Sequence, residues 1–317
     1  MTGEDLARVR VAPGAEPLWE VLLSAHLLGK SEGALVFDRW RGRMRPALVP
    51  RMRPLLALAP PWGYSPDFLT PPISLPDIDA AVENVLSTPR RRLREDIDQL
   101  AVGQAPAAWA GAVRRGEPAA LRQLGNAVTA YHRRAVDPYR DQIDSSVRAE
   151  RDRLARAFLT GGVEQVLNAL RPFALWEAPV LTLPSHPAER DIHLAGRGLT
   201  LLPSFFCWRA PTTLKNAEGP HVLVYPIQHD LAWLAPRKTD SASSLAALIG
   251  RTRATVLMTL AQSPATTSEL ARLVRISLPS ASEHTTVLRD AGLIVSHRYS
   301  TRVHHHITAL GTQLCTE

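Results

Sequence analysis

The sequence has little cysteine and no long apolar run, and each shortage excludes a class of protein. Its 317 residues include two cysteines, Cys207 and Cys315, too few for the disulfide framework of a small secreted domain. No apolar run approaches the roughly 18 residues of a membrane span. The N-terminal residues lack the basic-then-apolar order of a signal peptide. We therefore expect a cytoplasmic protein with no membrane partner.

The short motifs of common catalytic sites are also missing. The sequence contains no G-x-S-x-G, no H-E-x-x-H, no phosphate-binding glycine loop and no G-x-G-x-x-G after a predicted strand. Cys207 lies among aromatic residues, which is typical of a small buried side chain rather than of a nucleophile. We expect no enzymatic activity and no cofactor.

Length and composition favour two domains of the α+β class. The chain has a net charge of +7, and 45% of its residues are hydrophobic. A polar stretch from Pro236 to Ser244 lacks apolar periodicity and predicts a linker. It separates a domain over residues 1–238 from one over residues 243–317. The basic balance is compatible with nucleic acid but does not demand it.

The first domain predicts mostly helices, followed by a small antiparallel β region. Proline at helix starts and helical spacing predict helices from Asp77 to Leu170, with a break at Gly161-Gly162. After Pro172 the segments become short and apolar, which predicts strands. These cover Phe173–Leu183, Arg190–Leu194, Leu199–Trp208 and Val222–Ile227. Gly196-Arg197-Gly198 suggests a hairpin between two of them.

The stretch from Thr266 to Gly292 predicts two short helices joined by a tight turn, followed by a β-ribbon. Thr266 and Glu269 have the spacing of a capping box, so a helix can begin there. Ser277 is suited to cap the second helix, with a proline tolerated in its first turn. The side chains expected to face inward from the second helix are Ala281, Thr285, Leu288 and Ala291.

The outward face of this second helix carries small polar groups, and arginines flank it and the ribbon. Short donors and acceptors suit base edges in the major groove, and guanidinium groups suit phosphates. The helix, turn, helix and basic hairpin together predict binding to double-stranded operator DNA. The predicted DNA contacts are Ser280, Ser282, Glu283, Thr286, Arg289, Arg298, Thr301 and Arg302.

Residues 243–310 resemble the winged helix-turn-helix of ArsR-type bacterial regulators. The matching residues are SELARLV, the S-x-S-x-H of Ser280, Ser282 and His284, LRDAGLI, and a wing strand ending in HHIT. The chain departs from the family at Thr285, where leucine is usual. The resemblance implies a homodimeric transcriptional regulator, usually a repressor. His284 is expected to orient the helix by a local hydrogen bond.

The two metal sites known in this family are both absent. The helix before the turn has no cysteine, and the few residues after Thr308 contain no aspartate or histidine. His304 and His306 can share one face of a strand, with His297 opposite, but two ligands do not close a zinc site, and we favour a wing strand whose imidazoles face solvent or DNA. We expect no bound metal.

The N-terminal region resembles the long region of unassigned activity found on a subset of ArsR-like regulators from high-GC bacteria. The segments that carry this likeness are PLWE, PPWGYSPDFLTPP, GGVEQVL, GRGLTLLPSFFCW and LVYPI. Its aromatic residues could line a pocket for a small apolar effector, or they could form the core. The candidate effector residues are Trp62, Tyr64, Phe68, Trp176, Phe206 and Trp208. A protein partner at this domain, or an enzyme-like domain fused to the DNA-binding module, are the alternatives.

Overall fold

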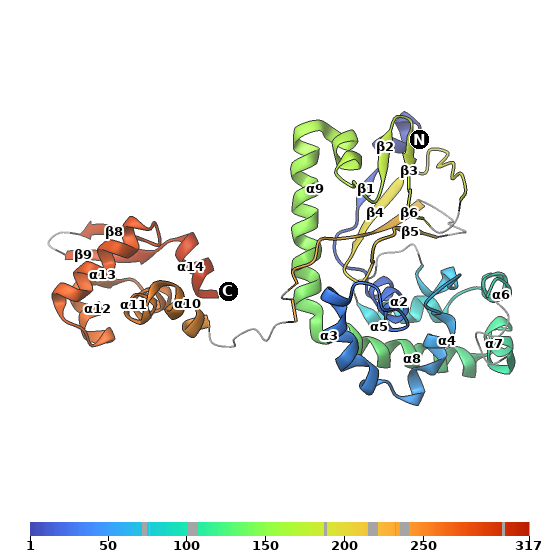
Figure 1. The fold of residues 1–317 in the computed structure, drawn as a ribbon, viewed down its shortest axis with the longest axis horizontal. Coiled ribbons are helices and arrows are strands. Elements are labelled where there is room, and N and C mark those ends of the chain that lie inside the picture. Colours follow the sequence, from blue (N-terminus) through green and yellow to red (C-terminus); the bar gives the residue numbers. More distant parts are fainter. Residues whose placement is uncertain are drawn as a thin grey trace. The chain divides into compact units, whose positions relative to one another are not determined.

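The computed structural model describes residues 1–71, 75, 77–100, 107–186, 189–214, 221–231, 233–234, 241–299 and 302–316. Their contacts divide the chain into two compact units, Met1–Trp233 and Leu234–Glu317 (Figure 1). Each unit has a buried apolar cluster of its own. Most of the predicted linker, residues 235–240, lies outside the described residues. No helix of the described chain is long and apolar enough to cross a membrane.

Helices form most of the first unit. The α-helices are α1 (Gly3–Ala7), α2 (Pro17–Leu28), α3 (Ala34–Met44), α4 (Arg53–Leu58), α5 (Ile78–Leu86), α6 (Arg90–Asp98), α7 (Ala107–Arg114), α8 (Pro118–Ala135) and α9 (Arg140–Asn168). Short 3₁₀ turns cover Arg45–Ala47, Pro50–Met52, Asp67–Leu69 and Asp137–Tyr139. The predicted helices between Asp77 and Leu170 are confirmed, with ends shifted by a few residues.

Local signals explain where several of these helices begin and bend. Thr2 and Asp5 form a capping box at the start of α1, and Pro17 and Pro118 occupy first helical positions of α2 and α8. The predicted break at Gly161-Gly162 is a kink within α9. Gly162 has φ 64°, a conformation that glycine adopts without a steric cost.

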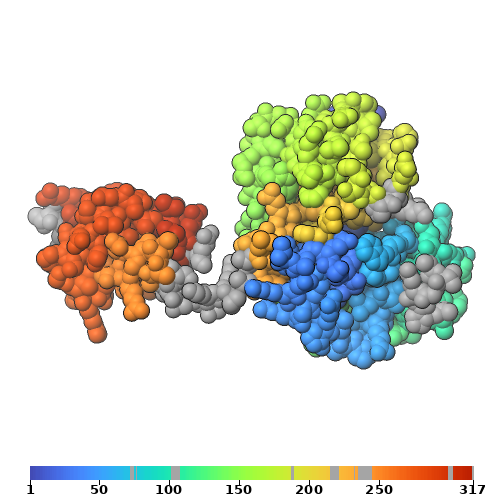
Figure 2. All heavy atoms as spheres, viewed as in Figure 1, coloured from blue at the N-terminus to red at the C-terminus, as the bar shows by residue number. Residues whose placement is uncertain are grey.

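Helix α2 lies at the centre of the helical part of this unit. All of its residues except His26 are buried, and α8 packs against α2, α4 and α5. Two buried polar contacts join these layers. Ser24 Oγ donates to Tyr131 Oη at 3.2 Å, and Trp40 Nε1 donates to the Ala135 carbonyl at 3.0 Å. On the surface, blue and cyan residues of the first hundred positions form the lower part of this unit in Figure 2.

The main sheet of the first unit has four strands in the order β1-β4-β6-β5, with bounds β1 Arg10–Val11, β4 Leu199–Ser204, β5 Thr212–Thr213 and β6 His221–Pro226. β4 pairs in parallel with both β1 and β6, and β5 pairs antiparallel with β6. Strands β4 and β6 are buried along nearly their whole length, as expected for parallel strands covered on both faces.

The α+β class is confirmed, and two details of the predicted β region are corrected. The region is only partly antiparallel, because β5 returns the chain so that β6 enters beside β4 in the same direction. Residues 190–194 form no strand, so Gly196 and Gly198 end a loop rather than a hairpin. The antiparallel hairpin instead joins β2 (Leu175–Glu177) to β3 (Val180–Thr182).

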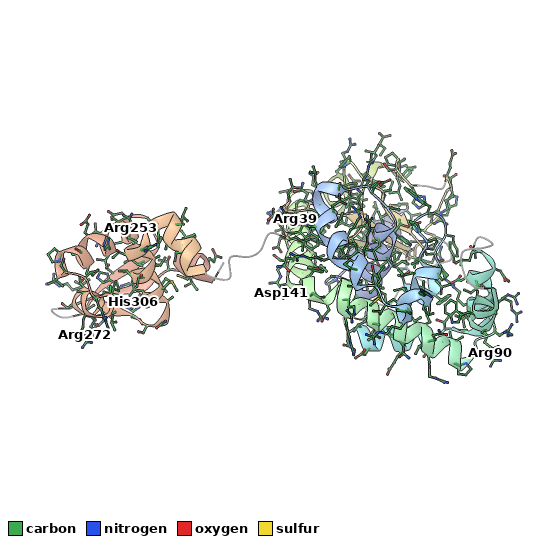
Figure 3. All side chains as sticks on the ribbon, turned by 60° about the horizontal axis from the view of Figure 1, so that its bottom comes forward. Arg39, Arg90, Asp141, Arg253, Arg272 and His306 are labelled. Atoms are coloured by element: carbon green, nitrogen blue, oxygen red, sulfur yellow. The ribbon has the colours of Figure 1, made fainter. Side chains whose placement is uncertain are left out.

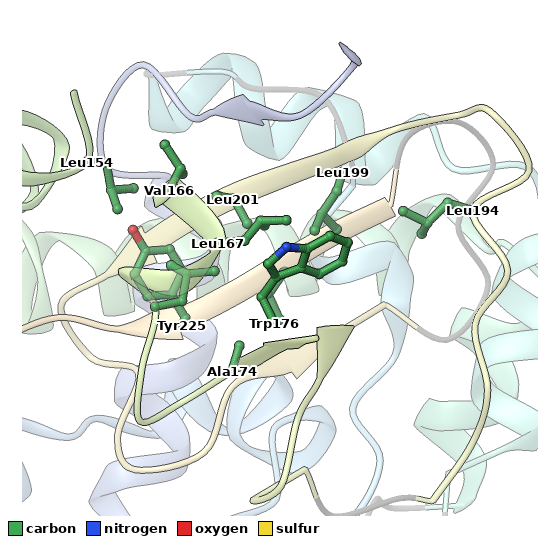
Figure 4. Close-up of a cluster of buried hydrophobic side chains, with 11 residues drawn as sticks. Leu154, Val166, Leu167, Ala174, Trp176, Leu194, Leu199, Leu201 and Tyr225 are labelled. Carbon is green, nitrogen blue, oxygen red and sulfur yellow. The ribbon is translucent and has the colours of Figure 1, made fainter. Parts of the chain in front are cut away.

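The apolar cluster of the first unit fills the space between the sheet, α9 and the β2–β3 hairpin (Figure 4). Trp176 lies in it with Leu201 and Tyr225, and Leu154 comes from α9. Tyr225 Oη donates to Glu150 Oε1 at 3.1 Å, and Arg153 pairs with the same carboxylate at 2.7 Å. The buried charge is therefore compensated where α9 crosses the sheet.

The second unit contains the two helices and the β-ribbon that the sequence predicts, together with further helices and a short strand. It contains α10 (Ser241–Ile249), α11 (Arg251–Gln262), β7 (Ala265–Thr266), α12 (Thr267–Val274), α13 (Leu278–Asp290), β8 (Ile294–Tyr299), β9 (Arg302–Ile307) and α14 (Ala309–Thr316). The strands form an antiparallel sheet in the order β7-β9-β8. Leucines of α10–α13, together with Leu293 and Ile294, close its core.

Candidate nucleic-acid interface

Helix α13 is positioned by its cap and by a row of small buried side chains. Ser277 Oγ accepts from the Ser280 amide at 3.2 Å, which satisfies one of the free amides at the helix start. Ala281, Thr285 and Leu288 face the core and are buried. The Thr285 hydroxyl donates to the Ala281 carbonyl at 2.9 Å, so a threonine is tolerated where the ArsR family usually has leucine.

Three of the predicted base-reading residues share the outward face of α13. Ser282 and Glu283 are exposed and Thr286 is half-buried, at the spacing that places side chains on one helix face. Ser280 differs from them. It is half-buried, and its hydroxyl lies 2.8 Å from Ser277 Oγ as part of the cap. The structure therefore brings together Ser282, Glu283 and Thr286, with Ser280 at the helix start.

The predicted cationic contacts lie at the end of α13 and on the wing. Arg289 and Arg298 are exposed, and the carboxylate of Asp290 lies 3.6 Å from the Arg289 guanidinium. Only the backbone of Arg302 is described, paired opposite Tyr299 at the end of the ribbon. Thr301 lies outside the described residues.

Two exposed arginines that were not predicted extend this cationic rim. Arg275 caps α12 in the left-handed region, with φ 59°, directly before the start of α13. Arg272 is exposed one turn earlier on α12 (Figure 3). Leu278, the first residue of α13, is 52% exposed, and an aliphatic group there can contact a thymine methyl. The available signal was an arginine two residues before the N-cap serine, Ser277.

His305 fastens the wing to the helix-turn-helix. Its ring is 3% exposed; Nε2 lies 2.9 Å from Thr267 Oγ1 on α12, and Nδ1 lies 2.9 Å from Ser296 Oγ on β8. Burial lowers the pKa of His305, and the charge of Arg289 lowers this pKa further. The neutral ring thus holds β8, β9 and α12 in one arrangement.

The other histidines of this unit are His284 on α13 and His297, His304 and His306 on the ribbon, the last three in the arrangement that the sequence predicts. Nδ1 of His284 is buried and has no hydrogen-bond partner among the described residues, so this nitrogen does not make the predicted local hydrogen bond. The rings of His297 and His306 lie 5.4 Å apart on one face of the ribbon, and His304 pairs directly opposite His297. In the described chain, no three His, Cys, Asp or Glu residues are grouped as metal ligands.

The six candidate effector residues are not brought together, which corrects the predicted grouping. Trp62 is 62% exposed, beneath the Lys30 ammonium at 4.2 Å. Trp176 lies in the cluster of Figure 4, whereas Phe206 and Trp208 contact the ring of Phe37. The last two are Phe68, which is buried, and Tyr64, which is half-buried. Large aromatic side chains lose the most water contact by packing into cores, and Phe68, Trp176 and Phe206 do so.

A pocket in the first unit lies elsewhere. Its volume is about 300 Å³, and it lies between residues 13–20, the end of α8 and the first half of α9. None of the six candidate effector residues lines it.

Residues 250–296 match the family model described as bacterial regulatory protein, arsR family. The matched segment runs from the residue before α11 into β8 and includes both helices of the helix-turn-helix. No curated protein and no solved structure matches the chain. The second unit therefore contains an ArsR-type helix-turn-helix, as the resemblance predicts, and this is the module with which transcriptional regulators bind DNA. The match does not extend into the first unit.

Proposed function

We propose that the protein is a homodimeric repressor that binds operator DNA through α13 and the wing and responds to a non-metal small molecule held by the first unit. The observation that carries the DNA-binding part is the outward face of α13. Ser282, Glu283 and Thr286 present short polar groups there, within a rim of exposed arginines. Short polar groups can bind base edges, and arginines can bind phosphates.

The arginine rim supports a division of roles within this interface. Arg275, Arg289 and Arg298 come from the turn, the end of α13 and the wing, so they surround the helix rather than extend its polar face. Contacts of this kind to phosphate give affinity that falls with salt and does not depend on sequence. Discrimination between sequences is left to the polar face.

The short reach of a single recognition helix supports the homodimer. A single α13 reads only a short half-site, and two of them must lie about one helical turn apart, ~34 Å, to read successive major grooves. A protein held on promoter DNA in this way excludes polymerase, which is the simplest form of repression. We propose that the first unit supplies or enlarges the dimer interface.

No catalytic step is assigned to the first unit. Its cysteine, Cys207, is 2% exposed, and burial raises the pKa of its thiol well above the ordinary value. A thiol that stays protonated is a poor nucleophile. This supports a binding role rather than an enzymatic one.

The test is fluorescence anisotropy with the protein's own upstream intergenic DNA and a scrambled duplex over a salt series. We expect preference for the native duplex at physiological salt and two chains per duplex at saturation. Arg298→Ala should weaken binding to both duplexes and reduce the salt slope by about one phosphate contact. Thr286→Ala should instead reduce the preference for the native duplex by about 1–3 kcal/mol.

Arg39→Ala is the matched control, because Arg39 is an exposed arginine on α3 of the first unit. This variant should change neither the salt slope of binding nor the preference for the native duplex. Equal binding to both duplexes, or one chain per duplex, would contradict the proposal. Identical behaviour of the Thr286 and Arg298 variants would contradict the assignment of roles.

A further inference from the structure

One face of α9 forms a wall of the pocket in the first unit, with Ile143 and Val147 as its apolar part. Six residues of α9 line it at positions 140, 143, 144, 147, 148 and 151, the spacing of a single helix face. Within this face Ile143 and Val147 are buried, at 2% and 1% exposure. Pro17 and Val136 add apolar surface from the start of α2 and the segment after α8. The pocket can therefore cover an apolar body.

Two guanidinium groups at this pocket have no counter-charge from the protein. In the described chain no carboxylate lies within 4.0 Å of Arg148 or Arg151, and neither has another recorded partner. Arg140, the third arginine of the lining, lies 3.4 Å from Asp137. Arg148 is exposed and Arg151 is half-buried, so both side chains remain accessible to a ligand.

The acidic residues of the lining do not neutralise these arginines. The Glu20 carboxylate accepts from the backbone amides of Phe205 and Phe206 at 2.9 and 3.0 Å and from Ser204 Oγ at 3.0 Å. Its oxygens are thus committed to the end of β4. Asp144 is the other acid of the lining, and its exposed carboxylate pairs with none of the three arginines within 4.0 Å.

One buried polar atom at the same pocket lacks a hydrogen-bond partner. His132, on the last turn of α8, is 3% exposed and contributes to the lining, and its Nδ1 has no hydrogen-bond partner among the described residues. Burial lowers the pKa of His132, so the ring is neutral near pH 7. Buried polar groups are rarely left unpaired in folded proteins. A polar atom of a ligand can supply the missing partner.

We propose that this pocket binds a small organic acid, with its carboxylate between Arg148 and Arg151 and its apolar body against Ile143 and Val147. A carboxylate matches the two-pronged geometry of guanidinium. Inorganic phosphate has no apolar body to cover this wall, so it should bind more weakly. Identification of the acid as the effector of DNA binding rests on the proposed function, whereas the binding itself does not.

Titration calorimetry of the full chain tests the binding, with benzoate and hexanoate as probes. Benzyl alcohol and hexanol are matched controls that keep the apolar body and remove the charge, and inorganic phosphate keeps only a charge. We expect both acids to bind with Kd below about 1 mM. The alcohols and phosphate should bind at least tenfold more weakly.

Arg148→Gln and Arg151→Gln should each weaken benzoate binding at least tenfold. Arg39→Gln, which removes an exposed arginine on α3 outside the pocket (Figure 3), should leave it unchanged. Because Arg148 is exposed and Arg151 half-buried, we expect the variants to fold, which tryptophan fluorescence verifies. Equal binding of acids and alcohols, no heat from either acid, or no effect of both pocket variants would overturn the proposal.

Anisotropy with the native duplex, measured with and without benzoate, separates this inference from the proposed function. A change in duplex affinity that Arg148→Gln abolishes would support both. Binding of benzoate in calorimetry with no change in duplex affinity would establish the pocket and contradict its role as an effector site. Duplex binding that is normal in a protein that binds no acid would contradict only the pocket.

Discussion

At the scale of single residues, Glu20 shows how one buried side chain connects distant parts of the chain. It comes from α2, and its carboxylate accepts three hydrogen bonds from Ser204, Phe205 and Phe206 at the end of β4. Burial raises the pKa of Glu20 to about 7, although these hydrogen bonds oppose the shift. The contact therefore stabilises the arrangement of α2 and β4 at the cost of burying a charge.

This raised pKa predicts how stability depends on pH. The protonated form is favoured in the folded state, so the stabilisation by Glu20 is full below its ordinary pKa of 4.5 and is lost as pH rises to about 7. Glu20→Gln does not titrate. The unfolding free energy of the wild type minus that of Glu20→Gln should therefore fall by about 2–3 kcal/mol between pH 5 and 8.

Urea unfolding followed by tryptophan fluorescence measures this difference. All seven tryptophans precede Leu234, so the signal reports the first unit. Glu177→Gln is a suitable control, because Glu177 is an exposed acid on β2. The difference in unfolding free energy between the wild type and Glu177→Gln should not change between pH 5 and 8. A flat difference for Glu20→Gln as well would show that Glu20 does not titrate in this range.

At the scale of elements, α13 and the wing depend on polar contacts that are separate from their apolar core. Ser277 supplies the cap of α13, and His305 joins the wing to α12 through Thr267 and Ser296. The Ser277 cap and the His305 hydrogen bonds position the exposed faces of α13 and the wing, and they add no apolar packing to the core. A weaker cap should therefore loosen the helix start that faces DNA while leaving the core intact.

Ser277→Ala tests this cap. Loss of an N-cap serine costs about 1 kcal/mol, so amides in the first turn of α13 should exchange about fivefold faster in hydrogen–deuterium exchange. Ser282→Ala makes the same chemical change on the exposed face of the same helix, and it should leave exchange unchanged while altering duplex preference. Equal exchange in both variants would exclude a stabilising role for the cap.

At the scale of the whole molecule, the two units close separate cores and carry different probes. The cluster around Trp176 and Leu201 belongs to the first unit, and the one around Leu257 and Leu270 belongs to the second. The second unit contains no tryptophan. Tryptophan fluorescence and far-ultraviolet circular dichroism therefore distinguish the unfolding of the two units.

We predict two thermal transitions by circular dichroism, of which tryptophan fluorescence detects one. Excess native duplex should raise the midpoint of the transition that fluorescence does not detect, by mass action on the folded DNA-binding unit. A scrambled duplex at the same salt concentration should raise it less. A single transition, with a midpoint that duplex raises in both circular dichroism and fluorescence, would mean that the two units unfold together.

The sequence by itself determined the elements whose signals are local. The capping box of Thr266 and Glu269, the cap at Ser277 and the break at Gly161-Gly162 each depend on residues a few positions apart. Hydrogen bonds and backbone preferences of this range leave a readable pattern. The exposure of Ser282 and Glu283 followed from the same helical spacing, once α13 was in place.

Only the tertiary structure decided what depends on long-range pairing. The parallel pairing of β1 with β4 joins Arg10 to Thr200, and strands this short carry no sequence record of partner or direction. Of the six candidate effector residues, Phe68, Trp176 and Phe206 pack into cores, because an aromatic ring suits either place. The pocket joins residues 13–20 to α8 and α9. Whether its arginines Arg148 and Arg151 have an acidic partner depends on how close the fold brings acidic residues from other elements. Spacing along the chain cannot encode that.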